Sequence, residues 1–233
     1  GTNQMAGFVS EFEGFKGTAL YTANFTPPTV PFSDAGQVIT DQAQNNITVV
    51  GSAVTVTDSS AFGGKCLQAN QAIGYVSIPP VDLLSMYWTI ECFIKPDALP
   101  ASTYMGVFDY GSAADGLGGL CVVIRYDGLP MCFMAYGLEI NVAGVTVAAG
   151  ERAHLFVQRS GGKIYIGCRG AVGTNRDVHA SFVGDKGFRV GYANVTYNET
   201  KAIKIDEWRV FEGEAKYPLS GTYTVPANPF PDL

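Results

Sequence analysis

The stretch ERAHLFVQRSGGKIYIGCR, residues 151–169, decides the fold of this chain. It predicts two strands joined by Gly161-Gly162, a pair suited to a type I′ turn, which needs φ above zero at both central positions. Side chains alternate along a strand, so each strand places its apolar residues on one face. That face carries Leu155, Val157, Ile164, Ile166 and Cys168. The opposite face carries Lys163, Tyr165 and Arg169, which predicts that it is exposed to solvent. We therefore interpret this hairpin as the central pair of strands in a β-sandwich.

Short alternating segments bounded by turn residues recur along the rest of the chain. We expect strands at residues 5–14, 47–57 (broken at Gly51), 66–69, 74–78, 87–95, 103–110, 120–126, 129–136, 138–142, 145–148, 188–192 and 203–211. Residues 81–86 are the one candidate for a helical turn. Within residues 87–95, the side chains of Trp88, Ile90, Cys92 and Ile94 share the expected core face. The sequence therefore predicts an all-β fold, a two-sheet antiparallel β-sandwich with little helix.

The composition limits the possible partners. The chain has 233 residues, of which 47% are hydrophobic and 15% charged, enough for a large core. Its net charge of −6 and its lack of a basic cluster disfavour nucleic acid, whose phosphates need Lys and Arg. No apolar run approaches the ~20 residues of a membrane span, and the N-terminus has no signal-peptide pattern. We expect no nucleic-acid partner and no membrane span.

The cysteines are odd in number and lie in apolar strand patterns: Cys66, Cys92, Cys121, Cys132 and Cys168. We expect them to be free, buried thiols, which fits folding in a reducing cytosol. No Cys-x-x-Cys occurs, and His154 and His179 have no partner at metal-ligand spacing. A zinc site is not expected.

The domain organisation is predicted to be one sandwich over residues 1–217, with an extended Pro- and Thr-rich insertion at 18–36. Residues 218–233 form a Pro-rich C-terminal arm in this interpretation, because Pro removes backbone donors. Residues 11–21 align without gaps on residues 207–217, sharing Glu, Phe, Gly, Ala and Tyr. Two explanations stay open: the N-terminus is the tail of a preceding repeat, or both segments are terminal strands that pair in one sandwich.

Four segments, taken in order, carry a family resemblance: GYVSIP (74–79), WTIECFIKPDALP (88–100), ERAHLFVQRSGGKIYIGCRG (151–170) and KIDEWRVFEGEAKY (204–217). They resemble the concanavalin A-like lectin/glucanase superfamily, and most closely the laminin-G-like domains of bacteriophage virion proteins. The resemblance covers most of the chain and implies a jelly-roll sandwich. It implies less about function, because such sandwiches include lectins, hydrolases and structural modules.

Catalysis is not expected. Glycoside hydrolysis needs two carboxylates facing one cleft, and glucanases of this superfamily carry them as Glu-x-Asp-x-x-Glu, which this chain lacks. Glu11 and Glu13 share a strand face but have no third acid. Asp206 and Glu207 are adjacent, so alternation points them to opposite faces. The sequence predicts no catalytic residue and a protein that is not an enzyme.

Two kinds of binding site are possible. Carbohydrate recognition uses exposed aromatic rings together with polar groups for hydroxyls. The candidates are Tyr110, Tyr136, Tyr165, Tyr192, Asn194 and Tyr197. A calcium ion is the one cofactor considered, with Asp109 and Asp115 flanking the loop DYGSAADG as carboxylate ligands.

The leading hypothesis follows from the resemblance: a non-enzymatic virion protein of a bacteriophage, made in the bacterial cytoplasm. It would work as a tail, fibre or capsid-decoration module. Its partners would be other virion proteins or copies of itself, and host-surface carbohydrate. The alternative is a free carbohydrate-binding module, and a glycoside hydrolase is a distant third.

Overall fold

A computed structural model describes residues 47–69, 74–79, 83, 85–111, 119–134, 138–178, 187–193 and 201–228. The chain divides into two units, Gly1–Val38 and Ile39–Leu233. All described residues belong to the second unit. The expected strand at 5–14, which aligns in part with residues 207–217, and the insertion at 18–36 lie outside the described residues. So do residues 81, 82 and 84 of the helical turn expected at 81–86.

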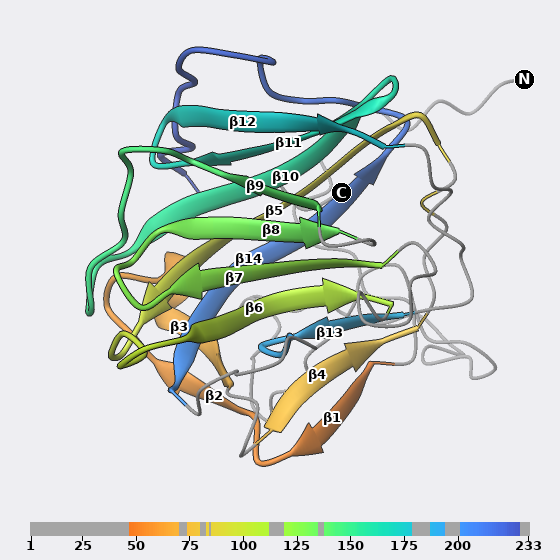
Figure 1. Ribbon diagram of the computed structural model, residues 1–233. Helices are drawn as coiled ribbons and strands as arrows, with labels where there is room; N and C mark the ends of the chain where they lie inside the picture. The colour runs from red at the N-terminus through yellow and green to blue at the C-terminus, as the bar shows by residue number, and fades with distance from the viewer. Residues whose placement is uncertain are drawn as a thin grey trace, which may run out of the picture. The chain divides into compact units, whose positions relative to one another are not determined.

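The described residues form two antiparallel sheets of seven strands each (Figure 1). Sheet A has the order β1 (Thr48–Gly51), β4 (Gly74–Ile78), β13 (Phe188–Val190), β6 (Tyr104–Tyr110), β7 (Leu120–Arg125), β8 (Pro130–Met134) and β9 (Leu138–Asn141). Sheet B has the order β12 (Ala171–Asp177), β11 (Lys163–Cys168), β10 (Ala153–Ser160), β5 (Tyr87–Pro96), β14 (Ile203–Glu212), β3 (Lys65–Ala69) and β2 (Val54–Thr57). One 3₁₀ turn, η1 (Phe62–Gly64), precedes β3. The predicted all-β sandwich with little helix is confirmed.

The core lies between the sheets. Alternation sends one face of each strand inward, and both sheets contribute to one apolar cluster. On β5 the inward set is the predicted Trp88, Ile90, Cys92 and Ile94, each 0% exposed. All cysteines predicted to be free thiols are free and buried. Burial raises the pKa of the Cys92 and Cys121 thiols. Within the described ranges, no helix is long and apolar enough to cross a membrane.

The hairpin of residues 151–169 forms as expected, with Ser160 opposite Lys163 and a two-residue turn between them. Three details differ from the prediction. Only Gly161 has a positive φ, of 61°, which is the φ pattern of a type II′ turn and not of type I′. The middle of sheet B is β5, between β10 and β14, so the hairpin lies to one side.

The third difference is the outer face of β10, which is not wet. His154 is 1% exposed, and Phe156 and Gln158 are 0% exposed. Residues 214–223, which follow β14, hydrogen bond to this face and cover it. We call this segment the strap. The N–H of Tyr223 donates to the Gly170 carbonyl at 2.8 Å, and Ala171 forms a bridge with Thr222.

Two other strand predictions need correction. The strand expected at residues 47–57 is divided at Gly51 (φ 70°) into β1 and β2, which enter different sheets. Residues 145–148 form a loop, in which the N–H of Val147 donates to the Gly128 carbonyl at 2.9 Å. Strand β12, with its largely exposed polar residues, was not predicted.

Candidate functional site

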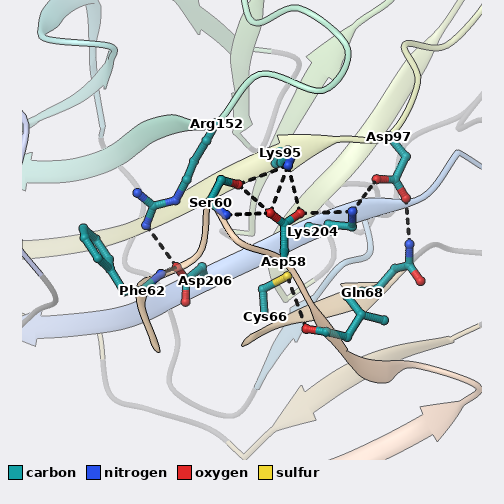
Figure 2. A network of polar contacts seen from close by, with 11 residues as sticks. Asp58, Ser60, Phe62, Cys66, Gln68, Lys95, Asp97, Arg152, Lys204 and Asp206 are labelled. Carbon is teal, nitrogen blue, oxygen red and sulfur yellow. Dashed lines mark hydrogen bonds and ion pairs between the residues drawn. The ribbon is translucent and has the colours of Figure 1, made fainter. Parts of the chain in front are cut away.

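Three polar clusters lie on the outer faces of the sheets, and the first surrounds Asp58, directly after β2. The Lys95 ammonium donates to both carboxylate oxygens of Asp58, at 3.0 and 2.9 Å, and Lys204 lies 3.1 Å away (Figure 2). The Ser60 hydroxyl donates at 2.6 Å. These bonds, led by those from Ser60 and Lys95, hold the pKa of Asp58 well below its usual range.

Asp206 extends this cluster. Its Oδ2 accepts from the Phe62 N–H at 2.8 Å and from Arg152 at 3.0 Å. The Arg152 guanidinium lies over the rings of Phe62 and Phe93, with its Cζ at 4.1 and 3.8 Å from the ring centroids. The gap that remains holds about 10 Å³, room for one water molecule and not for a sugar ring. This cluster fastens the loop after β2 to sheet B.

The second cluster lies beneath the strap and centres on Glu91, which is 0% exposed. Strand register assembles it, because Glu91 on β5 pairs with Phe156 on β10 and with Arg209 on β14. Arg209 donates from Nε to Oε1 of Glu91 at 2.8 Å. From the strap, Lys216 donates to the same oxygen at 2.9 Å, and the Tyr217 hydroxyl donates to Oε2.

His154 completes this cluster. Its Nε2 lies 3.0 Å from Oε2 of Glu91, and its Nδ1 lies 2.9 Å from the Tyr223 hydroxyl. Burial lowers the pKa of His154. Burial alone would raise the pKa of Glu91, but the bonds from His154, Lys216 and Tyr217 outweigh it and lower that pKa to about 2. A neutral imidazole therefore donates to a carboxylate and accepts from a tyrosine.

A β-bulge makes this arrangement possible. The pairing of β14 with β5 shifts between Asp206 and Arg209, where Glu207 has a φ of 54°. The extra residue sends Trp208 toward the core and aims Arg209 at Glu91. The prediction by plain alternation could not find this, because it assumes an unbroken period of two.

The third cluster is the most open to solvent, and it lies on the outer face of sheet A. Arg189 on β13 pairs in register with Asp109 on β6 and donates to its two oxygens at 2.8 and 2.5 Å. The Arg189 side chain is 28% exposed, while that of Asp109 is 0% exposed. The guanidinium lies over the Tyr192 ring at 4.2 Å, and the Tyr75 ring follows, with centroids 4.9 Å apart. Tyr75, Arg189 and Tyr192, all half-buried, form what we call the tyrosine–arginine stack.

The predicted sugar-binding residues are placed as follows. Tyr192 is in the tyrosine–arginine stack. Tyr110 is 1% exposed and packs in the core against Phe188, and Tyr165 is 6% exposed. Neither ring offers a face to a ligand. Tyr136, Asn194 and Tyr197 lie outside the described residues.

The predicted calcium ligands do not come together in the described residues. Asp109 is engaged by Arg189, and Asp115 lies outside them. Within the described ranges, no group of three acidic, histidine or cysteine side chains is placed to hold a metal ion. Sequence reasoning also missed two members of the stack, Tyr75 and Arg189. Alternation could have found both, since Tyr75 precedes the inward Val76, and Arg189 lies between the inward Phe188 and Val190.

Comparison with known proteins yields similarity in structure alone. No family model and no curated protein matches the chain. Domain 4 of AbnA, a GH43 extracellular arabinanase from Geobacillus stearothermophilus solved in complex with arabinotriose, superposes with a TM-score of 0.55 and 17% identity. The match covers 72% of this chain and 82% of that domain.

Binding domains of botulinum neurotoxins are similar to the same extent. The type G receptor-binding domain has a TM-score of 0.54 and 11% identity, and the DC binding domain in complex with SialylT has 0.55 and 10%. Each match covers 74% of this chain and 44% of the neurotoxin domain, so the chain spans less than half of those domains. At such identities the similarity shows the fold, a β-sandwich shared with carbohydrate-binding domains, as the family resemblance implied.

Proposed function

We propose that this chain is a non-catalytic, lectin-like module that binds a neutral saccharide at the tyrosine–arginine stack. The observation that carries the proposal is the half-open stack of Tyr75, Tyr192 and Arg189 beside the buried Asp109. Aromatic rings stack on the C–H faces of sugars, and planar charged groups bond to the hydroxyls. Tyr75, Arg189 and Asp109 lie on strands, and Tyr192 follows the end of β13 by two residues, so the site is held by the sheet.

The ligand class follows from the charges. Asp109 already balances the charge of Arg189 through two hydrogen bonds, so an acidic sugar would gain little from the guanidinium. The exposed part of the Arg189 guanidinium can still donate to sugar hydroxyl groups, whereas the carboxylate of Asp109 is fully buried. Arabinotriose is a suitable neutral probe, since the arabinanase domain of the same fold was solved with it.

The test is calorimetric titration of the full chain with arabinotriose and other neutral oligosaccharides, with sialylated ones as the acidic comparison. We expect Tyr192→Ala to weaken binding about tenfold, the loss of one aromatic stacking contact. Tyr126→Ala is the matched control, because Tyr126 also lies beside an arginine that pairs with an aspartate, and it is 49% exposed. Binding that Tyr126→Ala removes and Tyr192→Ala leaves would contradict this site.

The absence of catalysis is part of the proposal. The buried acids Glu91 and Asp109 and the half-buried Asp206 are each bound by an arginine, and Glu91 also by a lysine. A glycosidase needs one carboxyl group that protonates the leaving group, and cations beside a carboxylate favour its ionised form. Turnover of any β-glucan by the purified chain would refute this part.

The setting proposed from the sequence is a bacteriophage particle, in which the module would serve in a tail, a fibre or the capsid surface. Supporting it are the resemblance to laminin-G-like virion domains and the reduced state of the cysteines, which fits assembly in a bacterial cytosol. Its partners would then be other virion proteins or copies of itself. Labelling of purified particles with an antibody against this chain tests the setting.

Calcium binding also remains a proposal. A site that uses Asp109 and Asp115 would require Asp109 to release Arg189 or to share an oxygen with it. Titration of the chelated protein with calcium tests this directly. An Asp115→Asn variant should lose the heat of binding if the loop is the site.

A further inference from the structure

The two rims of the sandwich, where the edge strands of the sheets meet solvent, are built differently. At one rim the backbones of β9 and β12 touch. The N–H of Asn141 donates to the Thr174 hydroxyl at 3.0 Å, and that hydroxyl donates back to the Asn141 carbonyl at 3.1 Å. A Cβ at Gly173 would lie 2.2 Å from the same carbonyl oxygen. This rim is closed.

The opposite rim consists of β1 and β2. Strand β1 pairs with β4 and β2 pairs with β3, and neither has a second neighbouring strand among the described residues. Residues 47–57, ITVVGSAVTVT, contain no charged residue and no proline. Val49 and Val54 are each 47% exposed. We call this surface the open rim.

An open rim of this kind is chemically unusual. Edge strands present unpaired N–H and C=O groups that accept another strand, and proteins normally block them with lysine, proline, a bulge or a covering segment. Strand β12, at the closed rim, does carry charged residues, Arg176 and Asp177. Apart from Gly51, the strands β1 and β2 carry only β-branched residues, and a short turn joins them.

We propose that the open rim is a self-association surface, on which β1 pairs antiparallel with β1 of a second copy of this chain. The rim is neutral, so two copies that each carry a net charge of −6 can meet there without placing like charges together. A twofold axis brings identical edges together, and Val49 and Val54 of both copies gain apolar contacts.

The closed rim limits what can form. If both rims were open, copies could join edge to edge without end, whereas one open rim allows only a closed pair. A strand of four residues buries little area, so we expect a dimer that dissociates on dilution. The proposal names a surface for the self-association considered above. Tyr75 of the stack lies on β4 opposite Val50 of β1, so the two surfaces are neighbours. The rim contact uses the opposite, unpaired edge of β1 and does not require a bound sugar.

The test is sedimentation velocity of the full chain over a range of concentrations. We expect a reversible monomer–dimer equilibrium. The double variant Val49→Lys, Val54→Lys should raise the dissociation constant of the dimer at least tenfold and leave the thermal midpoint of the chain unchanged. Tyr126→Lys, at another exposed position, should leave the equilibrium unchanged. A chain that is monomeric at every concentration, or a dimer that the rim variant does not weaken, would overturn the proposal.

A second measurement locates the contact. The native thiols are buried and their pKa values are raised, so a cysteine introduced by Val49→Cys is the reactive one. Pyrene attached there should give excimer emission that grows with concentration, because paired strands lie about 4.8 Å apart. Monomer emission alone at concentrations where the dimer sediments would place the contact elsewhere. Protection of that thiol in a monomer would indicate instead that residues 1–46 of the chain cover the rim.

Discussion

The outer faces of the two sheets each carry a buried acid, but its arginine partner is covered on one sheet and partly exposed on the other. Each holds a buried acid paired with an arginine from the neighbouring strand, Glu91 with Arg209 on sheet B and Asp109 with Arg189 on sheet A. On sheet B the strap closes over the pair and adds a lysine and two tyrosines, and β10 adds His154. On sheet A the arginine remains 28% exposed, flanked by half-buried tyrosines.

The difference separates a sealed structural network from the surface proposed to bind a saccharide. A carboxylate that is 0% exposed and bound by several groups contributes to stability, because its removal leaves buried cationic partners without a counter-charge. A guanidinium whose side chain is 28% exposed can exchange water for a ligand. The comparison therefore favours a stabilising role for the face under the strap and is consistent with the saccharide site proposed on the open face. The three predictions below test the role of the sealed face, and the titration of Tyr192→Ala tests the role of the open one.

The largest effect should come from Glu91→Gln, which leaves Arg209 and Lys216 without their acid. We expect a loss of about 3–5 kcal/mol in the free energy of unfolding, as for other broken buried ion pairs. The measurement is urea denaturation at neutral pH. The control is Asp127→Asn, which breaks an exposed pair with Arg125 and should cost less than about 1 kcal/mol. Equal losses in the two variants would remove the distinction between a sealed and an open ion pair.

A smaller effect is expected from Gly167→Ala. The new Cβ would lie 2.1 Å from Cε1 of Phe156, whose ring stacks on Tyr217 of the strap at 4.3 Å and cannot easily move aside. Such overpacking costs about 1–3 kcal/mol. Gly162→Ala is the matched control, since it has open space and no positive φ, and should change the unfolding free energy little. Equal stability of the two variants would show that the strap is loosely held.

The smallest effect is a dependence of stability on pH through His154. Its pKa is lowered in the folded chain by burial, so the unfolded chain takes up the proton first. The stability it contributes is complete above its ordinary pKa of 6.5 and falls as the pH drops below that value, by at most about 1.4 kcal/mol per pH unit. The groups that face it are Glu91, Arg209, Lys216 and the two strap tyrosines, and Glu91 stays ionised until the pH nears 2.

Urea denaturation between pH 7 and pH 5 measures this dependence. We expect His154→Gln to flatten the profile in that range, and His179→Gln to leave it as in the parent chain. A profile that His154→Gln does not alter would mean that the imidazole is not held neutral beneath the strap.

Much of the fold follows from alternation in the sequence. The pattern of β5 places Trp88 and Ile90 in the core, and the Gly-Gly pair places the turn of the β10–β11 hairpin. Plain alternation gives the wrong result where a bulge shifts the pairing of two strands or where another segment covers the outer face of a sheet. The bulge at Glu207 reverses the faces of Trp208 and Arg209, and no local pattern reveals it.

The candidate site was less accessible from the sequence. Tyr192 was identified as an aromatic candidate, but Tyr110 has the same residue type and turned out to be a core residue. Asp109 was assigned to calcium because its partner lies 80 positions away, on a strand whose neighbour cannot be deduced without the topology. Residues 218–233 were predicted to be an extended Pro-rich arm, and the first six of them belong to the strap. The sequence did not show which surface they cover, because the position of a tyrosine in a Pro-rich segment does not identify its partner.

The place of β5 in the middle of sheet B has a consequence for synthesis on the ribosome. Its partner Arg209 is 118 positions after Glu91, so the early strand emerges long before β14 can dock beside it. Until then, the edge of β5 that β14 occupies has no strand beside it, and Glu91 lacks Arg209. A chain with such distant pairings folds slowly. We expect the nascent protein to need chaperone shielding over that interval, and stalled or truncated products lacking the last quarter to aggregate.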